Sequence, residues 1–379
     1  MKIGIFAITP AQIHFYKNIV KNLREAGHET FLMVRDYGES LPLVKELGID
    51  HYVFSDPPES KIGKVANFPL EILRATSYLR SKSVDVVTGF GLYEAYTSIG
   101  LRCPSITFTD SEYNCNRRSF LIQFWLSEKF IDYIITPEKY SQDLGTKQIR
   151  VKSYKELAYL HPHYYQPDPR VLDELGVEPG EPYVLLRFNA FDAVHDAGIS
   201  GFDDHQRELL VDVLEDHARV FISAEGRLND NLKQYLLPTK KSRIHDVISF
   251  AKLLVTDTQT MATESALLGT PTIRFNSFVG SNDMSNFIEL EQDYGLIYNF
   301  NNPLEAIEKA ERLILDPSLK KEWQKKRDTL LSDKDDIVEY FSHFIIEKSM
   351  KSPSLEHGQL KQSSAMREIK DSYLDFTRR

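Results

Sequence analysis

Short apolar runs alternate with helical patterns along the first half of the chain. Residues 12–26 carry apolar side chains at positions 13, 16, 19, 20 and 23, close to the 3.6-residue period of a helix. The apolar runs predict strands at residues 2–8, 30–34, 84–88, 105–109 and 133–136. Further helices are expected at residues 43–47, 93–101 and 120–130. Strands that alternate with helices form right-handed βαβ units and a parallel sheet.

Proline then interrupts this alternation, with three prolines in residues 161–169 and two more in residues 178–182. After the prolines, strands are predicted at residues 183–188, 219–223, 253–256 and 272–275, and helices at 204–215, 260–268, 303–315, 318–330 and 336–347. The predicted class is α/β, with two doubly wound, Rossmann-like domains that face each other across a cleft. The expected boundaries are 1–165 for the first domain, 166–182 for a linker, 183–332 for the second domain, 333–350 for a helix that packs back on the first domain, and 351–379 for a mobile polar tail.

Composition narrows the classes of function. The chain has 379 residues, 46 basic and 55 acidic side chains and a formal net charge of −9. This balance argues against a nucleic-acid partner, because such binding depends on neutralising phosphates, but it permits a small anionic ligand. Two cysteines, Cys103 and Cys115, are too few for a disulfide framework or a four-cysteine zinc site. The N-terminus lacks the pattern of a signal peptide, and no apolar run is long enough to span a membrane, so a cytoplasmic location is expected.

The most informative segment runs from the strand at 253–256 through a polar turn into a helix. Ligands bind at the carboxyl ends of parallel strands, and a helix that starts there offers unpaired amides to an anion. We therefore expect the backbone around Thr258, Gln259 and Thr260 to bind a phosphate. Glu264 follows Thr260 by four residues, on the same helix face, where its carboxylate can accept hydrogen bonds from ribose hydroxyls. The alternative is an ordinary capped helix, with Glu264 a solvated surface residue.

Other polar residues follow strands of the second half. Arg187 ends the strand at 183–188 and can pair bidentately with a phosphate, and Asn189 follows it. His195 lies in the next loop, where it either reaches the ligand or forms a local turn with its neighbour. Glu225 follows the strand at 219–223 and is expected to line the cleft.

In the first half, three residues are candidates for proton transfer. His14 lies at the start of the first helix, and an ordinary imidazole pKa of about 6.5 suits a general base. Asp110 and Glu112 follow the strand at 105–109, where burial of one carboxyl would raise its pKa. The alternatives are a solvent-facing histidine and a carboxylate pair that orients an acceptor or caps the next helix.

The spacing from Asp257 through Glu264 and Gly269 to Pro271 resembles the nucleotide-sugar motif of GT-B enzymes, above all that of non-hydrolysing UDP-N-acetylglucosamine 2-epimerases. The resembled motif has two glycines where this chain has Gln259 and Thr260. The whole chain, over about residues 1–345, also resembles domain of unknown function 354, a family expected to be GT-B glycosyltransferase-like. The matching segments are residues 8–16 (ITPAQIHFY), 26–29 (AGHE), 108–113 (FTDSEY), 187–189 (RFN) and 195–196 (HD), together with the motif itself.

The resemblance implies a GT-B enzyme that binds a nucleotide-diphosphate sugar such as a UDP-sugar. It would transfer the sugar, without a metal or other cofactor, to a glycan or lipid-linked acceptor in cell-surface polysaccharide synthesis. His14 would be the base, residues 258–260 would hold the diphosphate and Glu264 the ribose. Residues 121–135 would contact a lipid-linked acceptor or membrane surface, or else form a buried core helix. An epimerase and a non-catalytic nucleotide-sugar-binding protein are the alternatives. The first is weakened because Arg187-Phe188 stands where the epimerases have a His-Arg pair.

Overall fold

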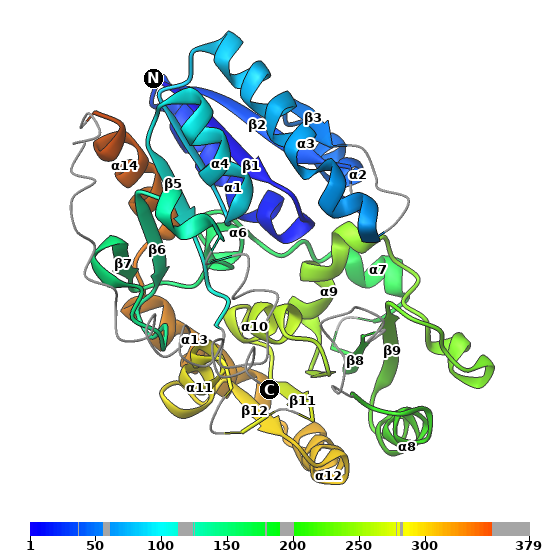
Figure 1. Cartoon of the computed structure of the whole chain (residues 1–379). Coiled ribbons are helices and arrows are strands. Elements are labelled where there is room, and N and C mark those ends of the chain that lie inside the picture. Colours follow the sequence, from blue (N-terminus) through cyan, green and yellow to red (C-terminus); the bar gives the residue numbers. More distant parts are fainter. Residues whose placement is uncertain are drawn as a thin grey trace, which may run out of the picture. The chain divides into compact units, whose positions relative to one another are not determined.

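The computed structural model describes residues 1–36, 38–55, 61–112, 124, 126–178, 180–189, 201–277, 279–280 and 283–350. Of these, the residues up to 159 and those from 335 onward form one compact unit, and residues 160–334 form a second. Figure 1 labels most of the helices and strands of both units. The first strand and the last helix belong to the same unit. His195 and the tail at 351–379 lie outside the described residues.

The first unit contains a parallel sheet of seven strands in the order β3-β2-β1-β4-β5-β6-β7. The strands are β1 (Lys2–Ala7), β2 (Glu29–Arg35), β3 (His51–Ser55), β4 (Val86–Gly89), β5 (Ser105–Phe108), β6 (Tyr133–Pro137) and β7 (Gln148–Val151). The five strands predicted for this half are confirmed. The two edge strands were missed, because neither β3 nor β7 is a continuous apolar run. β1 and β4 are adjacent although two strands separate them in sequence.

The helices of the first unit are α1 (Pro10–Glu25), α2 (Ser40–Glu46), α3 (Lys61–Lys82), α4 (Leu92–Leu101), α6 (Leu157–Leu160) and α14 (Ile337–Met350), with short 3₁₀ helices η2 (Glu128–Phe130) and η3 (Gly145–Lys147). Thr9 caps α1 by accepting a hydrogen bond from the amide of Gln12, and Pro10 occupies the first turn. α14 packs against α1, with the ring centroid of Phe341 5.5 Å from that of Phe15. The C-terminal helix therefore completes the apolar core of the first unit.

The second unit has a parallel sheet of five strands in the order β12-β11-β10-β8-β9. Its strands are β8 (Tyr183–Phe188), β9 (Arg219–Ala224), β10 (Leu253–Thr256), β11 (Thr272–Phe275) and β12 (Ile297–Phe300). Its helices are α7 (Val171–Leu175), α8 (Asp204–Glu215), α9 (Ile244–Phe250), α10 (Thr260–Leu267), α11 (Ser285–Gln292), α12 (Pro303–Ile314) and α13 (Leu319–Asp333), with η5 (Asp230–Tyr235) and η6 (Lys241–Arg243). The predicted α/β class with two parallel sheets is confirmed.

Candidate functional site

The strand orders locate one favoured ligand position in each unit. In the first sheet the chain builds β2 and β3 on one side of β1 and then β4 on the other, and in the second sheet β9 and β10 flank β8. At such a switch point the connecting loops leave in opposite directions and open a crevice at the carboxyl ends of the strands. The candidate residues of the first unit follow β1 and β5, and those of the second unit follow β8, β9 and β10.

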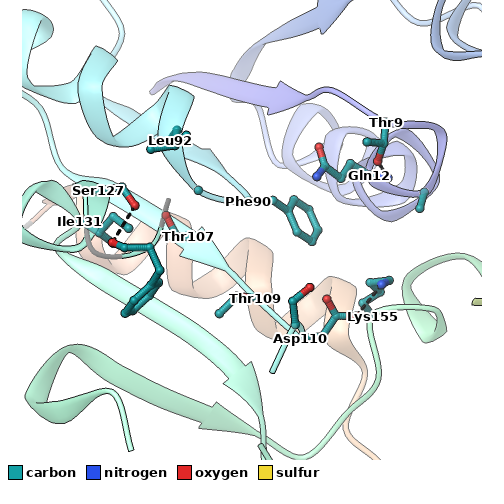
Figure 2. Close-up of a pocket in the computed structure, with 14 residues that line it drawn as sticks. Thr9, Gln12, Phe90, Leu92, Thr107, Thr109, Asp110, Ser127, Ile131 and Lys155 are labelled. Carbon is teal, nitrogen blue, oxygen red and sulfur yellow. Dashed lines mark hydrogen bonds and ion pairs between the residues drawn. The ribbon is translucent and has the colours of Figure 1, made fainter. Parts of the chain in front are cut away.

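A cavity of about 220 Å³ lies at the switch point of the first sheet (Figure 2). Its wall is formed by Thr9 and Gln12 after β1, by Phe90 after β4, and by Asp110 after β5, with Lys155 beside Asp110. This volume is below the roughly 300–1,000 Å³ of pockets that hold drug-sized ligands. The cavity therefore suits a small group, such as a single sugar ring.

Asp110 and Lys155 form an ion pair in the wall of this cavity. Lys155 Nζ lies 2.5 Å from Asp110 Oδ2 and 3.5 Å from Glu156 Oε1, and the two paired side chains are mostly buried. Burial alone would lower the pKa of Lys155, but the neighbouring carboxylates of Asp110 and Glu156 raise it above its usual range. Lys155 thus remains a cation that holds the Asp110 carboxylate in place.

Glu94 in α4 is hydrogen-bonded to two residues that line the cavity, and it was not among the candidates selected from the sequence. Its side chain is 1% exposed. Glu94 Oε1 accepts hydrogen bonds from the Gly91 amide at 2.5 Å and the Thr107 hydroxyl at 2.7 Å, and both of these residues line the cavity. A Cβ on Gly89 would lie 2.3 Å from Glu94 Oε2, so the carboxyl needs a glycine at that position. Burial raises the pKa of Glu94 to about 7, although the two hydrogen bonds act in the opposite direction.

Replacing Glu94 with glutamine is expected to remove part of the pH dependence of stability. Between pH 4.5 and about 7 the folded state keeps a proton on this carboxyl that the unfolded state has lost. Its contribution is complete below pH 4.5 and disappears as the pH rises through 7, a change of about 3 kcal/mol at about 1.4 kcal/mol per pKa unit. Urea unfolding at several pH values measures this, and wild type should lose stability more steeply than E94Q. Parallel curves for the two proteins would contradict the assignment.

His14 and Glu112, the other two candidates for proton transfer, are not among the residues that line the cavity. His14 is half-buried in α1, and its ring centroid lies 5.1 Å from that of Tyr159. Glu112 is 5% exposed and accepts a hydrogen bond from the Ser141 amide at 2.9 Å. Of the three candidates, the structure thus brings only Asp110 to the cavity wall.

At the switch point of the second sheet, Arg187 is held by two residues of the neighbouring strand and its loop. Its guanidinium donates to the Ser223 hydroxyl at 2.8 Å and forms an ion pair with Glu225. Arg187 and Ser223 are also paired in the register of β8 and β9. The amide of Asn189 donates to the Asp257 carboxylate at 2.7 Å. The structure therefore joins Arg187 and Glu225, which were predicted separately.

The turn before α10 differs from the prediction at one amide. The amide of Thr258 donates to the Thr256 hydroxyl at 2.9 Å, so it is not available to an anion as we had expected. The reason is a short local turn, since the Thr256 and Thr258 hydroxyls also lie 2.8 Å apart. α10 begins at Thr260, with Gln259 at its N-cap. The amides of its first turn, at Thr260, Met261 and Ala262, are those that an α-helix leaves without an intrahelical acceptor.

Glu264 is buried, which excludes its interpretation as a solvated surface residue. It is 7% exposed, and its Oε1 lies 3.0 Å from Nε2 of His245, which is itself 8% exposed. His245 belongs to α9, so the pair connects two helices. The motif of the sequence analysis thus combines a helix start at the carboxyl end of β10 with an oriented carboxylate one turn further along.

Comparison with protein-family models matches residues 1–342 to a family described as protein of unknown function (DUF354). The chain belongs to the DUF354 family. The resemblance inferred from the ordered motifs is therefore confirmed over most of the chain. Comparison with curated protein sequences gave no match.

Solved structures show the fold to which this DUF354 protein is similar. The glycosyltransferase VinC in complex with dTDP matches with a TM-score of 0.60 and 11% identity, over 92% of this chain and 100% of VinC. MnaA from S. aureus with UDP matches with a TM-score of 0.65 and 10% identity, over 95% of this chain and 99% of MnaA. The UDP-GlcNAc 2-epimerase from Neisseria meningitidis bound to UDP-GlcNAc matches with a TM-score of 0.62 and 11% identity, over 92% of this chain and 100% of the epimerase. These similarities confirm the GT-B-like fold. Among the residues that the structure describes, every helix is too short or too polar to cross a bilayer.

Proposed function

We propose that this DUF354 protein is a glycosyltransferase. Its second unit would bind a nucleotide-diphosphate sugar at the start of α10, and the cavity of its first unit would bind the acceptor. The observation that carries the proposal is the arrangement after β10, where the first turn of α10 is followed by the buried Glu264. Further support comes from solved proteins of the same fold, whose descriptions include a glycosyltransferase with dTDP and an epimerase with UDP-GlcNAc.

The chemistry of transfer assigns a separate task to each group. The amides of Thr260, Met261 and Ala262 would stabilise the negative charge that develops on the departing diphosphate, because they lie at the positive end of a helix dipole. Glu264, oriented by His245, would accept hydrogen bonds from the ribose hydroxyls. Asp110, held by Lys155, would take the proton from the acceptor hydroxyl as that oxygen forms the new bond to the sugar. His14 is the second candidate for this base. No metal is needed for these steps.

An epimerase is the second candidate function, because enzymes of that description share the fold. The missing histidine beside Arg187 favours transfer over epimerisation. A protein that binds nucleotide sugars without catalysis is the third candidate. All three require nucleotide binding and differ in the product that they form.

The experiment that separates these functions is an incubation of the purified chain with UDP-N-acetylglucosamine and UDP-glucose, with and without sugar acceptors. A transferase releases UDP in proportion to added acceptor, whereas an epimerase changes the configuration at C2 of the sugar and releases no UDP in net turnover. Thermal unfolding in the presence of UDP and dTDP tests binding alone, since a ligand at about 100 times its Kd stabilises the folded state by about 2.7 kcal/mol. Absence of any thermal shift with these nucleotides and sugars would refute the proposed function.

A further inference from the structure

Thr107 connects the wall of the cavity to Glu94. Thr107 is on β5 and lines the cavity, and its Oγ1 donates a hydrogen bond to Glu94 Oε1 at 2.7 Å. A hydroxyl has one proton and two lone pairs. Because the proton is directed at Glu94, the oxygen has only acceptor capacity left for a ligand in the cavity.

The neighbouring groups add to this acceptor character. The amide of Gly91, at the start of α4, donates to the same Glu94 oxygen, and the amide of Gln12, near the start of α1, donates to the Thr9 hydroxyl at 3.4 Å. Two helix starts that border the cavity therefore have one amide each already occupied within the protein. Asp110 contributes a carboxylate to the same wall, and the cation of Lys155, which also lines the cavity, is paired with that carboxylate. This set of groups favours a ligand that donates hydrogen bonds over one that carries negative charge.

We propose that the cavity binds a neutral, polyhydroxylated ligand, a sugar, and that Glu94 is a positioning residue that fixes Thr107 as the acceptor for one sugar hydroxyl. The inference deepens the proposed function and rests on it, since it names the class of acceptor that the transferase would use. Glu94 has no part in the lining of the cavity and acts only through Thr107 and Gly91. Its burial and its contact with Gly89 keep the carboxyl in one orientation.

The test measures binding of N-acetylglucosamine, D-glucose and D-mannose to the full chain by NMR titration, with inorganic phosphate as the anionic probe. Wild type should bind at least one sugar and bind phosphate more weakly. T107V, which keeps the shape of the side chain and removes the hydroxyl, should weaken sugar binding about tenfold, the effect of one lost hydrogen bond. T107S is the matched control and should stay within about threefold of wild type.

Glu94 is tested by comparing two variants at the same position. E94A should weaken sugar binding by about as much as T107V, because the Thr107 proton loses its acceptor. E94Q should restore binding, since its amide oxygen can accept the same hydrogen bond. This rescue distinguishes positioning from a role in stability alone, and T107V supplies the decisive result if E94A fails to fold.

Three outcomes would overturn the inference: failure of all three sugars to bind wild type, preference of the cavity for phosphate, or unchanged sugar affinity in T107V. The role of Glu94 would be refuted if the E94Q variant folds as wild type does but binds the sugar as weakly as E94A. UDP binding, measured separately on the same proteins, keeps the two proposals apart. Sugar binding without UDP binding would refute the nucleotide-sugar function and leave the cavity assignment in place.

Discussion

Replacing Asp110 with asparagine should lower kcat for sugar transfer by about 10²–10⁴-fold, the usual effect of removing a general base. Asp110 lines the cavity, and Lys155 holds its carboxylate at 2.5 Å. Asparagine keeps the size of the side chain but cannot accept a proton at neutral pH. The measurement is the rate of acceptor-dependent UDP release at saturating donor. The affinity for UDP should be unchanged, because the nucleotide is assigned to the other unit.

Two further substitutions serve as comparisons for D110N. E112Q alters a carboxylate that holds the Ser141 amide and does not line the cavity, so kcat should remain within a few-fold of the wild-type value. H14Q tests the second candidate base. A loss of kcat in H14Q that exceeds the loss in D110N would transfer the role of base to His14. The thermal midpoint of each variant shows whether a lower rate reflects unfolding, since D110N also breaks the ion pair with Lys155.

The parts of the fold that the sequence predicted are those whose burial is visible in the pattern of residues. β1 and β10 are continuous apolar runs between polar turns, and α1 has an amphipathic period with a capping threonine. β3 and α3 were missed for physical reasons. β3 is an edge strand, with Val53 38% exposed, and α3 contains Pro69 in its interior, where proline normally argues against a helix.

Some residues of the candidate site could likewise be predicted from the sequence, and others could not. Residues that follow strands could be selected because the carboxyl ends of parallel strands meet at one edge of a sheet. Arg187 and Glu225 were selected as candidates by this rule, and the structure pairs them with each other. Glu94 could not be found, because a glutamate in a helix is most often solvated and its burial depends on Thr107, a residue on the next strand. The one available signal was Gly89-Phe90-Gly91, since two glycines after a strand permit close approach by another group.

Replacing Glu264 with alanine should weaken UDP binding about 10- to 100-fold. Hydrogen bonds to a charged group contribute about 1.5–3 kcal/mol, and about 1.4 kcal/mol corresponds to a tenfold change in Kd. Glu264 is 7% exposed, so its carboxylate already has a fixed orientation, and binding would not have to order a mobile side chain. Isothermal titration calorimetry with UDP measures the effect, and uracil serves as the ligand without ribose.

The contact with His245 determines how this result is interpreted. H245Q can still hydrogen-bond to Glu264 and should lose much less affinity for UDP than E264A. Glu305, an exposed glutamate in the first turn of α12, provides the matched control, and E305A should bind UDP as wild type does. If Glu264 binds the ribose, E264A strongly lowers the affinity for UDP and has little effect on the affinity for uracil, which is lower from the start. If E264A folds normally and binds UDP with unchanged affinity, Glu264 serves only to join α9 to α10, and the ribose must be bound elsewhere.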